Sequence, residues 1–157
     1  MWNKIKPYVI SVAIALTVGG LSAFLTRGTM NIYEQITKPP AAPPEFLFPI
    51  VWTILYILMG ISAGIIYKEK GWSSLEVQNA LSVYACSLVI NFSWSIIFFK
   101  FRAFALAFAW LILLQATLIR TIILYRRIKP LAAYLQLPYA LWVAFAGYLN
   151  LAIVILN

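Results

Sequence analysis

Five long apolar stretches, each about as long as a lipid bilayer is thick, occupy nearly all of this 157-residue chain. A helix that crosses a bilayer needs roughly 20 consecutive apolar residues. With 64% hydrophobic and 10% charged residues, the chain has more apolar surface than a soluble core of this size can hide. We therefore predict an all-α membrane protein, a bundle of five transmembrane helices forming a single domain over residues 1–157. The expected spans are about 7–26, 46–67, 77–99, 103–125 and 131–156.

Basic residues gather at the ends of these spans and give a net charge of +8. Eight fall on the side of the N-terminus if Arg120 snorkels toward it, and four fall on the other side. The positive-inside rule then places the N-terminus in the cytoplasm and the C-terminus outside. Lipid phosphates, rather than nucleic acid, explain the charge. The first group is Lys4, Lys6, Lys68, Lys70, Arg120, Arg126, Arg127 and Lys129, and the second is Arg27, Lys38, Lys100 and Arg102.

Histidine is absent from the sequence, and none of its four acidic residues lies inside a predicted span. Intramembrane carboxylates and histidines build proton relays, ion sites and metal centres, so we expect no metal site. A Ser-His-Asp triad is also excluded. An odd number of spans without an internal repeat argues against a coupled carrier built from inverted repeats. Any chemistry must rely on aromatic rings, amides and hydroxyls.

Small residues recur four apart in the first two spans, where they allow close approach of helix backbones. They predict either packing within one bundle or the seam of a homodimer. The single cysteine, Cys86, is expected to be a small buried hydrophobic residue. The small residues are Ser11, Ala15, Gly19 and Ala23 in the first span and Gly60 and Gly64 in the second.

The loop over residues 27–45 ends in Lys38-Pro39-Pro40-Ala41-Ala42-Pro43-Pro44-Glu45. Its four prolines stiffen the chain and cannot continue a helix. Two interpretations stay open. The loop is either a rigid cap on the second span or a lid over a cavity at the outer face, with Tyr33 hanging from it.

A second polar segment lies within the third span. Asn91, Trp94 and Ser95 share one helical face at positions i, i+3 and i+4. Asn91 alone is typical of a hydrogen bond between helices. A tryptophan beside it, away from the membrane interface, needs a partner for its N–H and favours a binding pocket.

The fifth span carries a third segment, an aromatic face that begins after Pro138. Pro138 is expected to kink this helix and free a backbone carbonyl. The large rings beside a small alanine either pack against neighbours or leave room for a flat ligand. The residues of this face are Trp142, Phe145, Ala146, Leu149 and Asn150.

Together these segments resemble the tryptophan-rich sensory protein and translocator protein family, also called the peripheral benzodiazepine receptor family, over essentially the whole chain. Their order and spacing on five spans carry the resemblance. The motifs are Lys38-Pro39 with Pro43-Pro44, Trp52-x-x-Leu55-Tyr56-x-x-Met59-Gly60, Asn91-x-x-Trp94 with Phe98-Phe99, Pro130-Leu131-Ala132-Ala133, Pro138-Tyr139-x-x-Trp142-x-x-Phe145-Ala146 and Leu149-Asn150.

This resemblance implies a five-helix bundle, commonly a homodimer, with a cavity under the first loop. It implies porphyrins such as protoporphyrin IX and haem, and isoquinoline carboxamides, as ligands, with no resident cofactor required. Carried over by position, the ligand-binding residues are Tyr33, Pro43, Phe48, Trp52, Asn91, Trp94, Ser95, Trp142, Phe145, Ala146 and Leu149.

The sequence departs from the family pattern in three places. Ile32 stands where a tryptophan often precedes Tyr33, and Tyr148 is followed by no basic residue. Cholesterol recognition through the fifth-helix motif is therefore not expected. The basic tail of mitochondrial members is also missing, which favours a bacterial cytoplasmic membrane.

Three functions remain in competition. The first is a porphyrin receptor or sensor that sequesters or moves its ligand. The second, implied by the resemblance, is a light- and oxygen-dependent enzyme that degrades protoporphyrin IX, with Trp52 and Trp142 as catalytic residues. The third is a passive transporter of small lipophilic ligands.

Overall fold

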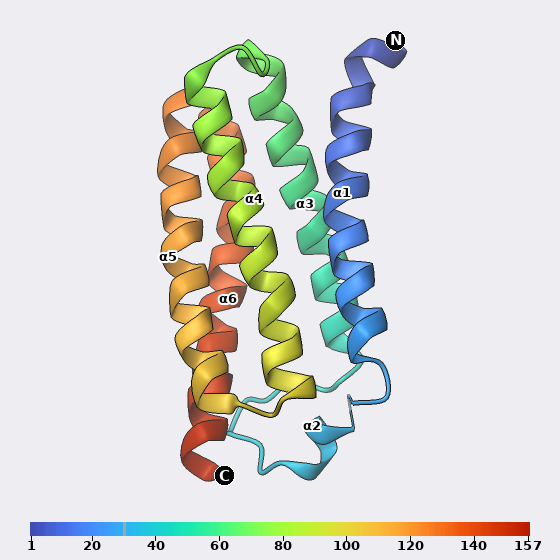
Figure 1. Ribbon diagram of the computed structural model, residues 1–157, viewed down its shortest axis with the longest axis vertical. Coiled ribbons are helices and arrows are strands. Elements are labelled where there is room, and N and C mark those ends of the chain that lie inside the picture. Colours follow the sequence, from blue (N-terminus) through green and yellow to red (C-terminus); the bar gives the residue numbers. More distant parts are fainter. Residues whose placement is uncertain (30) are drawn as a thin grey trace.

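The chain folds into a bundle of five long helices in the computed structural model, which describes residues 1–29 and 31–157. Within these residues, five helices are long and apolar enough to cross a membrane, which confirms the predicted all-α class. A short helix and a π-helical turn complete the fold (Figure 1). The elements are α1 (Trp2–Thr26), α2 (Ile32–Gln35), α3 (Leu47–Lys70), α4 (Leu75–Ser95), the π-helical turn η1 (Ile96–Lys100), α5 (Phe104–Ile128) and α6 (Pro130–Leu156).

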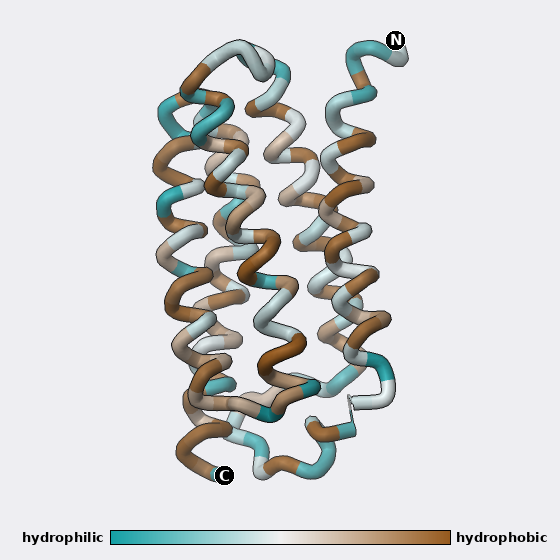
Figure 2. The backbone as a smooth tube through the Cα atoms, viewed as in Figure 1, coloured by the Kyte–Doolittle hydropathy of each residue, from teal (hydrophilic) through white to brown (hydrophobic). Residues whose placement is uncertain are grey.

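The five long helices pack side by side around one core. α1 packs on α3, α3 on α6, α6 on α5 and α5 on α4, and a lighter contact between α4 and α1 closes the ring. The two termini lie at opposite ends, and α2 lies at the end that holds the C-terminus, which we call the loop end (Figure 1). Hydrophilic residues gather toward both ends of the helices (Figure 2).

Two prolines lie inside long helices without ending them. α1 begins at Trp2, before the predicted start at residue 7, and continues through Pro7. Pro7 is the sixth residue of α1, so it lacks the N–H that would otherwise donate to the carbonyl oxygen of Asn3, and the helix continues without that bond. α6 has Pro130 in its first turn, a favoured position, and is continuous through Pro138.

Gly60 and Gly64 set the close packing of α1 against α3. A Cβ atom at Gly60 would lie 2.7 Å from the backbone nitrogen of Val12, and one at Gly64 would lie 2.8 Å from a ring carbon of Tyr8. Real side chains do not tolerate such contacts, so α1 and α3 approach this closely only because glycine stands there. This glycine pair therefore serves packing between helices of one chain, which was the first of the two interpretations of the small residues.

The prediction that Cys86 is buried is wrong, because its side chain is exposed. α4 turns one stripe inward, which includes Tyr84, Leu88 and Asn91, and Cys86 lies off that stripe. Lipid is as apolar as a protein core, so hydrophobicity does not reveal which side of a membrane helix faces inward.

Candidate functional site

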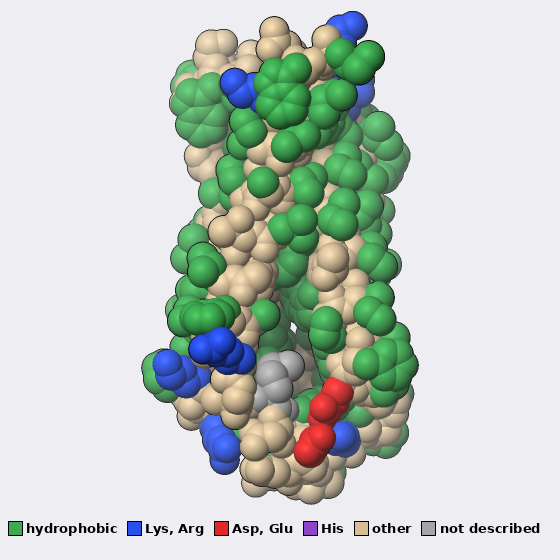
Figure 3. Space-filling view, turned by 90° about the vertical axis from the view of Figure 1, so that its right-hand side faces the viewer, with side chains coloured by type: hydrophobic (Ala, Val, Ile, Leu, Met, Phe, Trp, Pro, Cys, Tyr) green, Lys and Arg blue, Asp and Glu red, His purple; other side chains and the backbone are tan. Residues whose placement is uncertain are grey.

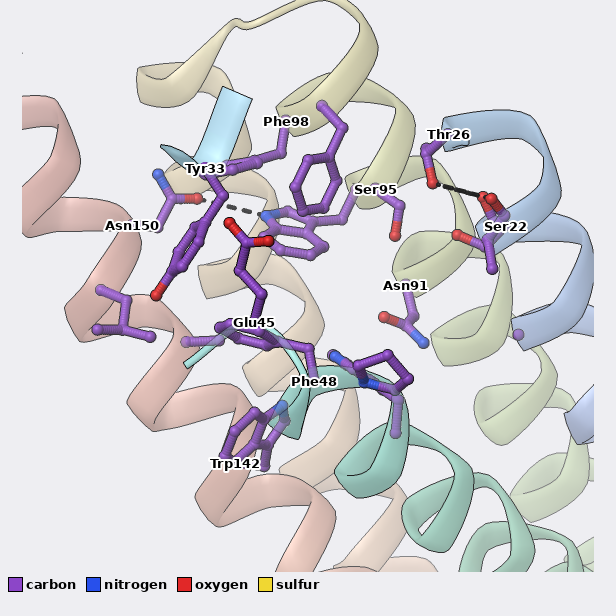
Figure 4. Close-up of a pocket in the computed structure, with 18 of the residues that line it drawn as sticks. Ser22, Thr26, Tyr33, Glu45, Phe48, Asn91, Ser95, Phe98, Trp142 and Asn150 are labelled. Atoms are coloured by element: carbon purple, nitrogen blue, oxygen red, sulfur yellow. Dashed lines mark hydrogen bonds between the residues drawn. The ribbon is translucent and has the colours of Figure 1, made fainter. Parts of the chain in front are cut away.

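A cavity of about 370 Å³ lies within the bundle toward the loop end. Its walls come from α1, α3, α4, η1 and α6, and the first loop covers it with Tyr33 and Glu45 (Figure 4). The surface of the molecule is hollowed toward the same end (Figure 3). A volume of this size lies in the range of small-molecule sites. Nine of the eleven residues that the resemblance implies as ligand-binding line the cavity: Tyr33, Phe48, Trp52, Asn91, Trp94, Ser95, Trp142, Ala146 and Leu149.

Three tryptophans from three helices give the cavity its aromatic walls. Trp52 of α3, Trp94 of α4 and Trp142 of α6 all line it. Phe48 links the roof to the wall, since its ring centroid lies 5.3 Å from that of Tyr33 and 6.0 Å from that of Trp142, both edge to face. These separations fall in the favourable range for aromatic pairs. The rings therefore brace one another around a largely apolar space.

The floor of the cavity carries a buried amide. Asn91 is 2% exposed, and its Nδ2 donates a hydrogen bond of 2.7 Å to the hydroxyl oxygen of Tyr56. This bond joins α4 to α3, as expected for a buried amide in a membrane bundle. The side-chain oxygen of Asn91 accepts no hydrogen bond from the described residues, and both residues line the cavity. Asn91 thus serves packing and also offers an acceptor to a ligand.

Trp94 is held by a second polar bridge. Its Nε1 donates to Oδ1 of Asn150 at 3.3 Å, and Nδ2 of Asn150 donates to the carbonyl oxygen of Phe104 at 2.9 Å. The bridge joins α4, α6 and α5, and it leaves only the ring of Trp94 for a ligand. The indole N–H groups of Trp52 and Trp142, in contrast, donate to no group in residues 1–29 or 31–157.

The first loop is fastened over the cavity from two directions. The Tyr33 hydroxyl donates to the carbonyl oxygen of Pro43 at 3.0 Å, and the Tyr148 hydroxyl of α6 donates to that of Pro40 at 3.0 Å. Asn157 pairs with the backbone of Thr37, whose N–H donates to Oδ1 at 3.0 Å and whose carbonyl accepts from Nδ2 at 3.2 Å. These bonds hold the first loop against the C-terminal end of α6.

The loop also shapes the start of α3. The backbone N–H groups of Leu47 and Phe48 donate to the carbonyl oxygens of Pro44 and Glu45. The prolines therefore lead directly into the helix, so the same segment covers the cavity and begins α3. The loop thus begins α3, as the first interpretation proposed, and its role as a lid stays a prediction.

Two residues singled out from the sequence do not line the cavity, namely Pro43 and Phe145. Pro43 acts through its backbone, as the acceptor for Tyr33. The Phe145 ring packs behind the wall, 5.5 Å from Trp142 and 6.2 Å from Tyr148 by ring centroids. The wall follows positions 142, 146, 149 and 153 of α6, and Phe145 lies at the edge of that face.

Sequence reasoning missed the contribution of α1. Gly19, Ser22 and Thr26 line the cavity, although the small residues of this span indicated only packing. The π-helical turn was missed as well. It follows α4 and places both Phe98 and Phe99 on the cavity.

The mouth of the cavity carries one charge of each sign, Arg27 and Glu45. Lys38, the other cation of the first loop, lies over the Tyr33 ring, 4.5 Å from its centroid. Burial and the nearby Glu45 carboxylate raise the pKa of Tyr33, so its hydroxyl stays protonated and remains a hydrogen-bond donor. Arg27 could have been found as the first charged residue after the first span.

Comparison with known proteins places the chain among related membrane proteins. The model of the TspO/MBR family matches residues 11–156. "Tryptophan-rich protein TspO" of Chlorobaculum tepidum is 33% identical over 100% of this chain and 99% of its own length. "Translocator protein" of Bos taurus is 36% identical over 92% of this chain and 88% of its own. "Protein CrtK" of Rhodobacter capsulatus is 33% identical over 96% of this chain and 90% of its own.

Proposed function

The chain belongs to the TspO/MBR family of membrane proteins, and from this premise we propose that it is a membrane receptor for tetrapyrroles, which binds protoporphyrin IX or haem and sequesters or moves it. One observation carries the proposal. Three indoles from three helices wall a single apolar cavity under a fastened loop. Flat aromatic ligands gain most from such walls, since ring faces and edges attract one another and exclude water.

The polar groups of the cavity are placed to orient a ligand of this kind. Porphyrin propionates are anionic, and Arg27 at the mouth supplies the opposite charge. The unpaired N–H groups of Trp52 and Trp142 and the free oxygen of Asn91 offer donors and an acceptor deeper in. A site of mostly apolar walls with a few fixed polar groups is the usual design of a small-molecule pocket.

The residues of the cavity favour a metal-free porphyrin over axially ligated haem. The sequence has no histidine, so an axial ligand would have to be Tyr, Cys or Met. Cys86 faces outward, and Met59 is fully buried away from the cavity. Tyr33 and Tyr56 line it, but both hydroxyls are engaged in hydrogen bonds within the protein. Among the residues that the structure describes, none lining the cavity therefore offers a free axial ligand, and we expect haem to be held by its faces; Met30 lies outside the described residues.

A dark titration with protoporphyrin IX, followed by tryptophan quenching in detergent, tests the proposal. Ala146 lines the cavity, whereas Ala105 of α5 is exposed on the outer surface and lines neither this cavity nor the groove between α5 and α6. We expect saturable binding near a micromolar Kd, or about −8 kcal/mol, that Ala146→Phe loses and Ala105→Phe keeps. An isoquinoline carboxamide should compete for the same site. Equal quenching in both variants would show that the porphyrin binds elsewhere or only enters the micelle.

A second candidate function is favoured by the free indole edges of Trp52 and Trp142. In that function the photo-excited porphyrin takes an electron from an indole and passes it to molecular oxygen. The indole radical then recovers an electron from the macrocycle, and the reduced oxygen adds to the oxidised macrocycle and opens it. Trp110 is the matched control, because its N–H donates to Ser93 Oγ at 2.8 Å and it lies outside the cavity. Trp52→Phe and Trp142→Phe should stop product formation under light while keeping dark binding, and Trp110→Phe should do neither. Product at the original rate in the first two variants contradicts this role.

A further inference from the structure

Four residues of the cavity wall are exposed on the outside of the bundle, and all four lie along the seam between α1 and α3. The other residues that line the cavity are buried or half-buried. We call the opening between the four exposed residues the slot. Figure 3, which faces the α1 side of the bundle, shows the surface hollowed toward the loop end. The residues of the slot are Ala23, Arg27, Glu45 and Pro49.

The register of the two helices places the apolar residues of the slot opposite each other. Gly60 of α3 lies against the backbone of Val12 of α1, and the two helices run in opposite directions. Moving eleven residues toward the loop end along each helix brings Ala23 opposite Pro49. The seam is closed by backbone contact at Gly60, and at the level of the slot it is lined by two small side chains. Both of these side chains are exposed outside and also line the cavity.

The charged residues of the slot follow four positions further toward the loop end, one on each side. In the part of the chain that the structure describes, Arg27 and Glu45 do not form an ion pair. The Arg27 guanidinium lies instead over the Phe24 ring, 4.2 Å from its centroid. The two charges therefore do not bridge the slot.

The neighbouring seams of the cavity are closed. Between α1 and α4, Ser22 is buried on one side and Asn91 and Trp94 are buried on the other. Between α3 and α6, the rings of Phe48 and Trp142 are in edge-to-face contact, with centroids 6.0 Å apart. Toward the loop end, the first loop covers the cavity and is bonded to α6. The slot is thus the side on which the cavity wall reaches the surface.

The slot lies at the level where acyl chains meet lipid headgroups. α1 has 25 residues and is about 37 Å long, a few ångströms longer at each end than the hydrocarbon core of a bilayer. Ala23 lies about 5 Å inside the end of α1, and Pro49 lies about 3 Å inside the start of α3. Their neighbours Phe24 and Ile50 are exposed apolar residues that suit contact with acyl chains. The charged residues of the slot lie just beyond, among the headgroups.

We propose that the tetrapyrrole enters and leaves the cavity through the slot, from the lipid leaflet at the loop end rather than from water. This inference rests on the proposed function, since it concerns the same ligand and the same cavity. An amphipathic molecule in a bilayer keeps its charges among the headgroups and its apolar part among the acyl chains. Protoporphyrin IX therefore meets the slot with its propionates beside Arg27 and its ring beside Ala23 and Pro49. Glu45 repels the propionates and so directs them toward Arg27.

Stopped-flow mixing in the dark, with the protein in lipid vesicles and protoporphyrin IX as the probe, tests the slot. Ala23→Phe narrows the slot, and Ala13→Phe is the control, because Ala13 is exposed on the same helix and does not line the cavity. We expect Ala23→Phe to slow association and dissociation alike, by tenfold or more, so that Kd changes less than twofold. Lost contacts inside the cavity would act differently, because they raise Kd mainly through faster dissociation.

Two results would overturn the slot while the parent protein still binds porphyrin. One is that Ala23→Phe keeps the rates of the parent, and the other is that only its dissociation becomes faster. A parent protein that binds no porphyrin would instead overturn the proposed function itself. Should Ala23→Phe fail to fold, Pro49→Phe carries the same test from α3, with Ile50→Phe as its control, since Ile50 is exposed and does not line the cavity.

The order of events in the same mixing experiment tests the source of the ligand. Porphyrin fluorescence rises when the molecule passes from water into lipid, whereas quenching of protein tryptophan reports its arrival in the cavity. We expect the quenching to lag behind the rise in fluorescence. Quenching that begins before the porphyrin has entered the lipid would mean entry from water and would overturn the proposal.

Discussion

A single methyl group added at Gly19 should disturb the floor of the cavity. A Cβ atom there would lie 2.6 Å from Cδ2 and 2.9 Å from Cζ of the Tyr56 ring. Carbon atoms prefer separations of about 3.5 to 4.0 Å, so the ring must move by roughly 1 Å. Such a movement strains the 2.7 Å hydrogen bond between Asn91 and Tyr56. Overpacking of this kind costs about 1–3 kcal/mol, and the lost hydrogen bond adds about 0.5–1.5 kcal/mol.

Gly20 supplies the matched control, because a Cβ atom there meets nothing within 4 Å. Alanine gains about 1 kcal/mol over glycine in a helix interior at either position, so helix propensity affects both variants equally. We expect Gly20→Ala to raise the Tm slightly and leave protoporphyrin affinity unchanged. Gly19→Ala should lower the Tm and weaken binding about tenfold or more, since tenfold is about 1.4 kcal/mol.

Thermal unfolding in detergent and the dark titration measure the two effects on the same samples. The comparison needs no assumption about detergent, since both variants differ from the parent by one methyl group in the same helix. If Gly19→Ala matched Gly20→Ala in both assays, the contact between α1 and Tyr56 would not shape the cavity and the reasoning would fail.

Three other substitutions should have distinct outcomes. Gly60→Ala should destabilise the bundle by about 1–3 kcal/mol, because the added methyl group forces α1 away from α3. Gly147→Ala is the control and should not destabilise it, since a Cβ atom there has no neighbour within 4 Å. Equal Tm values for the two variants would refute the close approach of α1 and α3. Asn150→Leu leaves the Trp94 N–H unpaired, at a cost of about 1–3 kcal/mol, and also removes the bond to the Phe104 carbonyl oxygen. An unchanged Tm would contradict the bridge. Asn157→Ala removes both bonds to the lid and should speed porphyrin release several-fold in stopped-flow mixing; unchanged release would mean the lid is not held there.

The fold could be predicted almost entirely from the sequence. Charge-free stretches long enough to span a bilayer indicate membrane helices, because lipid offers no partner to backbone N–H and C=O groups and a helix pairs them within one segment. The rotation of each helix could not be predicted so well. Cys86 faces outward although it is apolar, since lipid and core attract such residues equally. The packing face of Gly60 and Gly64 could be predicted, unlike that of Cys86, because close approach of two helix backbones requires a small residue.

The site was predictable where polar and aromatic residues break an aliphatic background. Trp52, Asn91 and Trp142 stand out in that way, and all line the cavity. The small residues of α1 were not predictable as cavity walls, as Gly19 illustrates, because the same pattern serves packing between helices. The π-helical turn had no signal in the sequence either, since its register change depends on the packing of the finished bundle.

The measurement that tests the central claim most directly is a structure of the protein with protoporphyrin IX, determined in the dark. The account predicts the macrocycle in the cavity, in contact with Trp52, Trp94 and Trp142, with its propionates toward Arg27 at the mouth. A macrocycle on the outer surface, for example in the groove between α5 and α6 lined by Phe108 and Gln115, with the cavity unchanged, would contradict it.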